Sequence, residues 1–129
     1  MNERGAASVA LLGVLVFALM LGAAVASVGA FFEGRTRAAA AADAAALAAA
    51  PVTFLPFGAR GTPAEEAARF AAANGASLVG CSCPVDRSWA HRTVIVDVER
   101  RVRLWPVGAV TVRARGRAEF SPALLLGGG

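Results

Sequence analysis

Residues 5–32 read GAASVALLGVLVFALMLGAAVASVGAFF, and this stretch decides the fold because none of its 28 residues carries a charge. Glu3 and Arg4 precede it, and Glu33 and Arg35 follow it. A helix of that length reaches about 40 Å at 1.5 Å per residue. The hydrocarbon layer of a bilayer is about 30 Å thick, so we expect a helix that spans a membrane with some tilt.

The same helix is expected to continue beyond the apolar stretch. Positions 35–50 contain eleven Ala, the residue with the highest helix propensity, and no Gly or Pro. Glu33 and Arg37 lie four residues apart, in the order that favours an ion pair on a helix. Pro51 is expected to end the helix. The sequence therefore predicts one continuous rod over 6–50.

Small residues recur at every fourth position along this rod. At that spacing they let two helix backbones approach closely, which is how helices associate in lipid. An Ala-rich chain also produces such rows through helix propensity alone, so that explanation stays open. The positions expected to pack against other helices are Gly22, Ala26, Ala30, Gly34, Ala38 and Ala42.

A short helix is predicted after a Pro- and Gly-rich loop whose apolar side chains are expected to fold back onto the rod. Thr62 is its expected N-cap, with Glu65 completing a capping box, and Asn74 marks its end. An ion pair between Glu65 and Arg69 is predicted from their spacing. Phe70 is expected to be the main apolar contact of this helix.

The period of apolar residues changes to two after the short helix. Segments 77–83, 93–101 and 107–116 read as strands, and in 93–101 the valines alternate with Ile, Asp, Glu and Arg. This alternation predicts three antiparallel strands with one buried face. The expected fold class is α+β, with a long N-terminal transmembrane helix followed by a small domain of one short helix and about three antiparallel strands.

These patterns divide the chain into four segments and predict its topology. We expect the first helix to be retained as a single-pass anchor in the cell membrane, with the later domain outside the cytoplasm. The charges that flank the apolar stretch are nearly balanced, so they do not fix this orientation. The segments are a cytoplasmic leader-like segment (1–5), the transmembrane helix with its Ala-rich extension (6–50), a small extracytoplasmic domain (51–120) and a flexible tail (121–129).

A secretory signal peptide is the alternative to a retained anchor. The apolar core 11–21 has a suitable length and is followed by two candidate signal-peptidase sites, Ala24-Val25-Ala26 and Val28-Gly29-Ala30. Cleavage there would release a secreted basic domain. The single Arg before the apolar stretch, and hydrophobicity that continues to Phe32, favour retention. The alternative function is then a signal-cleaved binding module.

Cys81 and Cys83 lie two residues apart on a predicted strand. In extended backbone their Cα atoms would be near the limit of about 7 Å for a disulfide, so a bridge between them requires a turn. A disulfide or redox role, intermolecular pairing and two buried thiols all stay open. A zinc site that adds His91 and Asp86 matches no standard ligand spacing, so no metal is expected.

All thirteen basic residues are Arg, and the net charge is only +4. This charge does not by itself imply a nucleic-acid partner, and none is expected. Arg113, Arg115 and Arg117 share one face of a predicted strand. They form either a face for a polyanion, such as acidic lipids or DNA phosphates, or a solvated face that prevents aggregation.

Catalytic patterns are absent from the sequence. The single His lies in no nucleophile motif, and a phosphate-binding loop with its invariant Lys is excluded because the chain contains no Lys. The carboxylates are few and scattered, which leaves no paired acid and base. We therefore expect neither an enzyme nor a cofactor.

Three segments together match a known pattern. They are Arg4-Gly5 ahead of the apolar helix, the run Arg35-Thr36-Arg37-Ala38 before the Ala-rich segment, and AANGASLVGC at 72–81 before the valine-rich strands. With these segments the chain resembles the TadE/TadG-like minor pilin family of tight-adherence secretion systems, and most of all its short actinobacterial TadE-like members. The similarity extends to about Ala118.

The resemblance implies a pilin-like membrane protein that helps to assemble a pilus or secretion apparatus and has no catalytic activity. Its implied partners are the membrane, other pilus or secretion-system proteins, and further copies or relatives in an oligomer. In related prepilins a peptidase cuts after a Gly, which corresponds here to Gly5 before Ala6. Those proteins usually carry Glu at the fifth residue after the cut, whereas this chain has Ala10.

Overall fold

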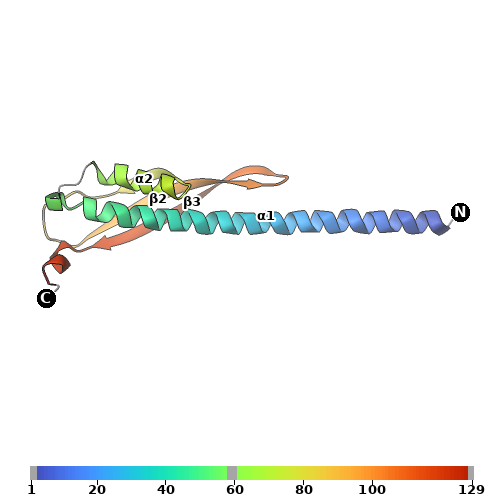
Figure 1. The fold of residues 1–129 in the computed structure, drawn as a ribbon, viewed down its shortest axis with the longest axis horizontal. Helices are drawn as coiled ribbons and strands as arrows, with labels where there is room; N and C mark the ends of the chain where they lie inside the picture. The colour runs from blue at the N-terminus through green and yellow to red at the C-terminus, as the bar shows by residue number, and fades with distance from the viewer. Residues whose placement is uncertain (1–2, 58–60, 128–129) are drawn as a thin grey trace.

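The computed structural model describes residues 3–57 and 61–127. A long helix extends from the N-terminus, and the other elements pack along its C-terminal part (Figure 1). The α+β class predicted from the sequence is confirmed. In chain order the elements are α1 (Glu3–Val52), η1 (Leu55–Phe57), α2 (Pro63–Ala73), β1 (Ser77–Ser82), β2 (Arg92–Leu104), β3 (Gly108–Phe120) and η2 (Pro122–Leu125).

Helix α1 runs without interruption from Glu3 to Val52, as the alanine content predicts. The Glu33–Arg37 ion pair is confirmed, with Oε1 and Nη2 2.5 Å apart. Pro51 does not end the helix directly but lies inside its last turn. The helix ends one residue later, at Val52. Thr53 then caps this end, since its Oγ1 donates to the carbonyl of Ala50 at 2.6 Å.

Helix α2 begins with the predicted capping box. The backbone N–H of Glu65 donates to Thr62 Oγ1 at 3.2 Å, and the N–H of Thr62 donates to Glu65 Oε2 at 2.8 Å. The predicted Glu65–Arg69 ion pair is therefore wrong, because the cap already occupies the Glu65 carboxylate. Arg69 instead pairs with Glu66, which is one residue closer along the helix.

The apolar face of α2 consists of small residues rather than of Phe70. Ala67 and Ala71 are buried, whereas Phe70 remains 38% exposed, so the prediction that Phe70 is the main apolar contact is wrong. Helix α2 packs directly on α1. Two helices that meet through alanines lie too close together to place a phenyl ring between them.

The three strands form one antiparallel sheet in the order β1-β2-β3. β2 and β3 make a hairpin whose register runs without a shift from Arg92 opposite Phe120 to Leu104 opposite Gly108. Both strands are longer than predicted, while β1 ends one residue earlier, at Ser82. β1 pairs with β2 through one register shift near Gly80.

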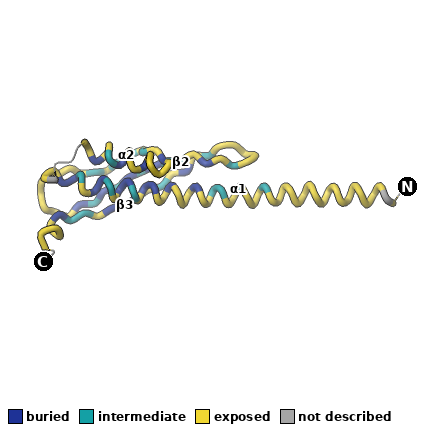
Figure 2. Tube along the Cα trace, in the orientation of Figure 1, coloured by how far each residue is buried: buried dark blue, intermediate teal, exposed yellow. Residues whose placement is uncertain are grey.

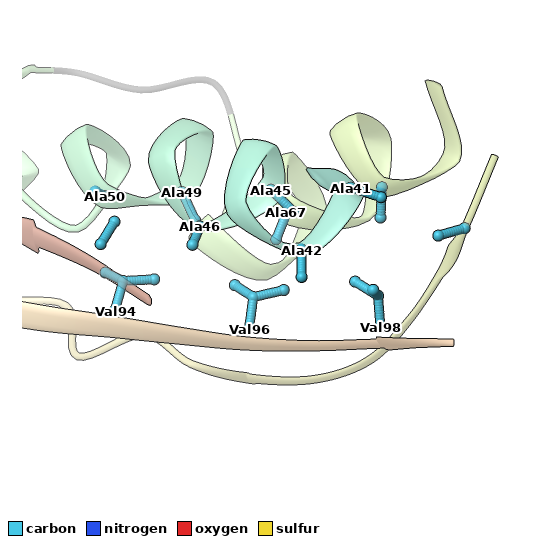
Figure 3. Close-up of a cluster of buried hydrophobic side chains, with 13 residues drawn as sticks. Ala41, Ala42, Ala45, Ala46, Ala49, Ala50, Ala67, Val94, Val96 and Val98 are labelled. Atoms are coloured by element: carbon cyan, nitrogen blue, oxygen red, sulfur yellow. The ribbon is translucent and has the colours of Figure 1, made fainter. Parts of the chain in front are cut away.

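The core lies between α1 and the sheet. Val94, Val96 and Val98 of β2 are fully buried, which confirms the predicted inward face. Figure 3 shows these valines pointing toward the alanines of α1. An Ala side chain ends at Cβ, so the helix approaches the sheet closely and the valines fill the layer between them. The helix residues of this core are Ala41, Ala42, Ala45, Ala46, Ala49 and Ala50.

Aromatic contacts close the C-terminal end of the core. Phe54, from the loop after α1, is buried, with its ring centroid 4.9 Å from that of Trp89 and 6.5 Å from that of Phe120. Leu55 stays exposed, and the side chain of Phe57 lies outside the described residues. In the segment predicted as a flexible tail, η2 forms and Pro122 is buried.

Candidate functional site

The N-terminal half of α1 is a large apolar surface that the rest of the chain leaves mostly uncovered. Figure 2 shows burial concentrated where the sheet covers α1, while the part toward the N-terminus is exposed. This helix is long and apolar enough to cross a membrane, by length and composition. An apolar patch of this extent is typical of a membrane or protein interface. Its large exposed side chains are Val9, Leu11, Leu12, Val14, Leu15, Val16, Phe17, Leu19, Met20, Leu21, Val25, Val28 and Phe32.

The row of small residues divides into two parts. Gly22 and Ala26 are exposed and Ala30 is half-buried. The second half of the row, Gly34, Ala38 and Ala42, is buried, with Ala38 and Ala42 in the clusters formed with the sheet.

Gly34 illustrates how closely the second half of the row meets the sheet. A Cβ atom at this position would lie less than 3.0 Å from Cγ2 of Val102. No such neighbour exists at Gly22, where a Cβ atom would meet no atom within 4 Å. Close packing at Gly34, Ala38 and Ala42 therefore occurs within the chain, and packing of Gly22 and Ala26 against another helix stays a prediction.

Gly5 and Ala6 lie in the first turns of α1, and both are exposed. The side chain of Arg4 lies outside the described residues. Exposure is a requirement for cleavage between Gly5 and Ala6, but the helical backbone would have to open locally before a peptidase could hold it extended. Processing at this bond stays a prediction.

Cys81 and Cys83 form a disulfide, with Cα atoms 5.4 Å apart. This separation is shorter than that of extended backbone, because β1 ends at Ser82 and Cys83 lies outside the strand. Both cysteines are half-buried and pack against the main core. The disulfide joins the end of β1 to the loop that leads to β2, and a redox role stays a prediction.

Arg113, Arg115 and Arg117, the arginine stripe, lie on the outer face of the sheet, and each has a carboxylate partner. Arg115 donates from Nε to Asp97 Oδ1 at 2.7 Å and from Nη2 to Oδ2 at 3.1 Å. The corresponding distances are 3.7 Å from Arg113 to Glu99 and 2.8 Å from Arg117 to Glu119.

These pairs reduce the positive charge that the stripe presents. Hydrogen bonds from Arg115 lower the pKa of Asp97, so this carboxylate remains ionised beside its partner. A polyanion would have to compete with three carboxylates for these guanidinium groups. Binding of a polyanion at the stripe stays a prediction.

Arg92 is a buried cation that the sequence analysis did not identify. Only 7% of it is exposed. Its Nη1 donates to the carbonyl oxygens of Thr53 at 2.9 Å and Asp86 at 3.0 Å, and Nη2 donates to that of Ser88. These bonds join the end of α1 to the loop before β2. The sequence contained a signal for this burial, because Arg92 lies two residues before Val94 and therefore on the same face of β2 as the buried valines.

The residues considered for a zinc site do not converge. Within the described part of the chain, no group of three or more His, Cys, Asp or Glu is placed to hold a metal ion. His91 Nε2 lies 3.8 Å from a carboxylate oxygen of Glu119. Asp86 instead accepts hydrogen bonds from the N–H and hydroxyl of Ser88, which lower its pKa.

Comparison with known proteins identifies the segment that carries the resemblance. Residues 5–52 match the model of the Tad family, described as "Putative Flp pilus-assembly TadE/G-like". The matched segment corresponds almost entirely to α1, so the resemblance stated from the sequence is confirmed over this helix. Neither the search of curated proteins nor that of solved structures found a match.

Proposed function

We propose that this chain is a non-enzymatic, membrane-anchored component of a pilus-assembly or secretion apparatus, with residues 5–32 in the bilayer and the α+β domain outside the cytoplasm. The match of residues 5–52 to a pilus-assembly family supports the biological context. The observation that carries the anchor is the contrast within α1. Its N-terminal half exposes large apolar side chains, whereas one face of its C-terminal half is buried against the chain's own sheet and α2.

The mechanism follows from the continuity of α1. The alanine face of residues 38–50 is embedded in the domain core, so the domain cannot rotate about the helix without unpacking that core. A rod of this kind transmits the position of the membrane segment directly to the outer domain. Partners would then bind through helix packing at Gly22 and Ala26 and through contacts of the domain.

Release by signal peptidase is the competing hypothesis, and the structure is compatible with it. The buried part of α1 begins at Gly34, so cleavage near Ala26 or Ala30 would leave the helix residues of both core clusters in place. The released domain would be the secreted basic binding module. The intact mass of the mature chain separates these outcomes, because it identifies the first residue directly.

Alkaline carbonate extraction of membranes tests the anchor. The full-length chain should stay in the membrane pellet. A Leu15→Arg/Leu19→Arg variant should move to the soluble fraction, because each Arg near the centre of a membrane helix costs about 3 kcal/mol of insertion. Leu47→Arg is the matched control, since Leu47 is an exposed Leu on the same helix but beside the domain. A wild-type chain recovered in the supernatant, with a mass that starts beyond residue 26, would refute the anchor.

A further inference from the structure

The hairpin of β2 and β3 ends in an exposed apolar tip. Residues 105–107, hereafter the hairpin tip, follow the last pair of the register, Leu104 and Gly108. Trp105 is 77% exposed and Val107 is 75% exposed, although both are large and apolar. Figure 1 shows the hairpin reaching past α2 along α1 toward the N-terminus. A tryptophan displayed in this way at the end of a hairpin contributes little to the core of its own domain.

The hairpin tip meets α1 inside the apolar stretch. Ser27 Oγ lies 2.5 Å from the carbonyl oxygen of Trp105 and 2.9 Å from that of Ala23, which fixes the tip against the helix. An open apolar groove of about 470 Å³ lies between the tip and α1. The helix side of the groove is formed by Val16, Leu19, Met20, Ala23, Ala24 and Ser27.

The level of this contact places the tip within the predicted membrane segment. Ser27 precedes Glu33, the first charge after the apolar stretch, by six residues, or about 9 Å along the helix. Trp is enriched at this depth in membrane proteins, because its ring suits the boundary between hydrocarbon and headgroups. Pro106 and Val107 add apolar surface at the same level.

Three exposed arginines lie on the domain side of the tip, and we call them the arginine belt: Arg35, Arg101 and Arg103. Val102, between the latter two, packs at Gly34, so the belt is level with the first charges after the apolar stretch. Arg101 and Arg103 also line a shallow groove shared with Glu33 and Arg37. In the described part of the chain, no ion pair engages the belt, whereas every member of the arginine stripe has a carboxylate partner.

From this arrangement we infer that the hairpin tip is a second membrane contact. Trp105, Pro106 and Val107 insert into the outer leaflet beside α1, lipid acyl chains fill the apolar groove, and the arginine belt binds headgroup phosphates of anionic phospholipids. This inference rests on the proposed anchor, since it takes residues 5–32 as the membrane span. A helix alone is free to tilt and rotate in lipid, and a second contact restricts both movements for the attached domain.

Single-tryptophan variants of the full chain test the insertion in vesicles. The chain has two Trp residues, so Trp89→Phe leaves Trp105 as the reporter and Trp105→Phe leaves Trp89 as the matched control. Trp89 lies against Phe54 at the far end of the domain. Brominated phospholipids should quench Trp105 several-fold more than Trp89, and bromine near the headgroup should quench it more than bromine at the chain end.

The outcomes separate this inference from the anchor. Equal quenching of the two reporters in a chain that resists carbonate extraction would overturn the tip insertion and leave the anchor intact. Loss of the chain from the membrane would overturn both. A third outcome concerns the groove. If quenching of Trp105 rises when the protein is diluted in lipid, a second copy of the chain occupies the groove at high protein density, and the assignment of the groove to lipid would be overturned.

The headgroup contact has its own measurement. Trp105 quenching should increase when vesicles of phosphatidylcholine are replaced by vesicles that also contain phosphatidylglycerol. Arg101→Gln/Arg103→Gln should abolish this increase, whereas Arg113→Gln, from the paired stripe, should retain it. An increase that survives in the double variant would exclude the belt from lipid binding.

Discussion

Gly116 of β3 packs directly on the backbone of α1 at Ala42. A Cβ atom on Gly116 would lie less than 3.0 Å from the carbonyl oxygen of Ala42 and from the backbone nitrogen of Asp43. Neither of these atoms can move without bending the helix. The distance between the sheet and α1 is therefore set at this point by the absence of a side chain.

Gly116→Ala should lower the stability of the domain by about 1–3 kcal/mol, the range for forcing an extra methyl group into a packed layer. Thermal unfolding of the full chain in detergent micelles measures this effect. Gly80→Ala is the matched control, because a Cβ at Gly80 would meet no atom within 4 Å. Equal melting temperatures for the two variants would contradict the close approach.

Removal of the buried cation should be more damaging than removal of an exposed one. Arg92→Met removes one donor from the carbonyl oxygens of Thr53 and Asp86, which keep the backbone N–H groups of Asp86 and Leu55. A hydrogen bond from a charged group contributes about 1.5–3 kcal/mol. Arg103→Met, at an exposed position of the same strand, should change the unfolding free energy little. Comparable urea midpoints for both variants would show that the Arg92 hydrogen bonds do not hold the loop.

The Asp97–Arg115 pair predicts a pH-dependent contribution to stability. Arg115 lowers the pKa of Asp97 below its ordinary value of 3.8 in the folded chain. The contribution is therefore present above pH 3.8 and is lost as the pH falls through the lower, folded-state pKa. Wild type should melt above Asp97→Asn at neutral pH, and the gap should close in acid.

The pH test has an internal control in Arg115→Gln, which removes the partner and keeps the carboxylate of Asp97. Adding Asp97→Asn to the Arg115→Gln variant should lower the melting temperature at neutral pH by less than the same substitution does in the wild type. Because both members of the Asp97–Arg115 pair are exposed, the effect should be small and should weaken in high salt. If the melting-temperature difference between wild type and Asp97→Asn persists unchanged below the folded-state pKa, its cause is not the ionisation of Asp97.

Substitutions in the two halves of the small-residue row should have opposite consequences. Gly22→Ile adds a side chain where no atom lies within 4 Å, so the domain should melt normally while crosslinking to neighbouring proteins in the membrane decreases. Gly34→Ile should instead lower the melting temperature, because its side chain would collide with Val102. Unchanged crosslinking of Gly22→Ile would remove this position from the assembly surface.

Much of the architecture was predictable because it depends on local periodicity. The capping box at Thr62 and Glu65 and the inward valines of β2 were predicted correctly. Two failed predictions depended on contacts that spacing along the chain does not reveal. Glu65 could pair with Arg69 only if the cap did not use it, and Phe70 could enter the core only if α2 and α1 were farther apart.

The sequence by itself determined the elements: an apolar stretch too long for a small core, an alanine run that continues it, and an alternating pattern that makes strands. Each of these signals lies within one short segment of the sequence, so it can be recognised without any tertiary contact. Only the tertiary structure decided which part of the small-residue row packs against the chain's own sheet. It also decided which carbonyl groups accept hydrogen bonds from the buried Arg92, and that Trp105 lies beside Ser27, 78 residues away in the chain. Such contacts depend on how the helix packs on the sheet, and no local sequence pattern contains that information.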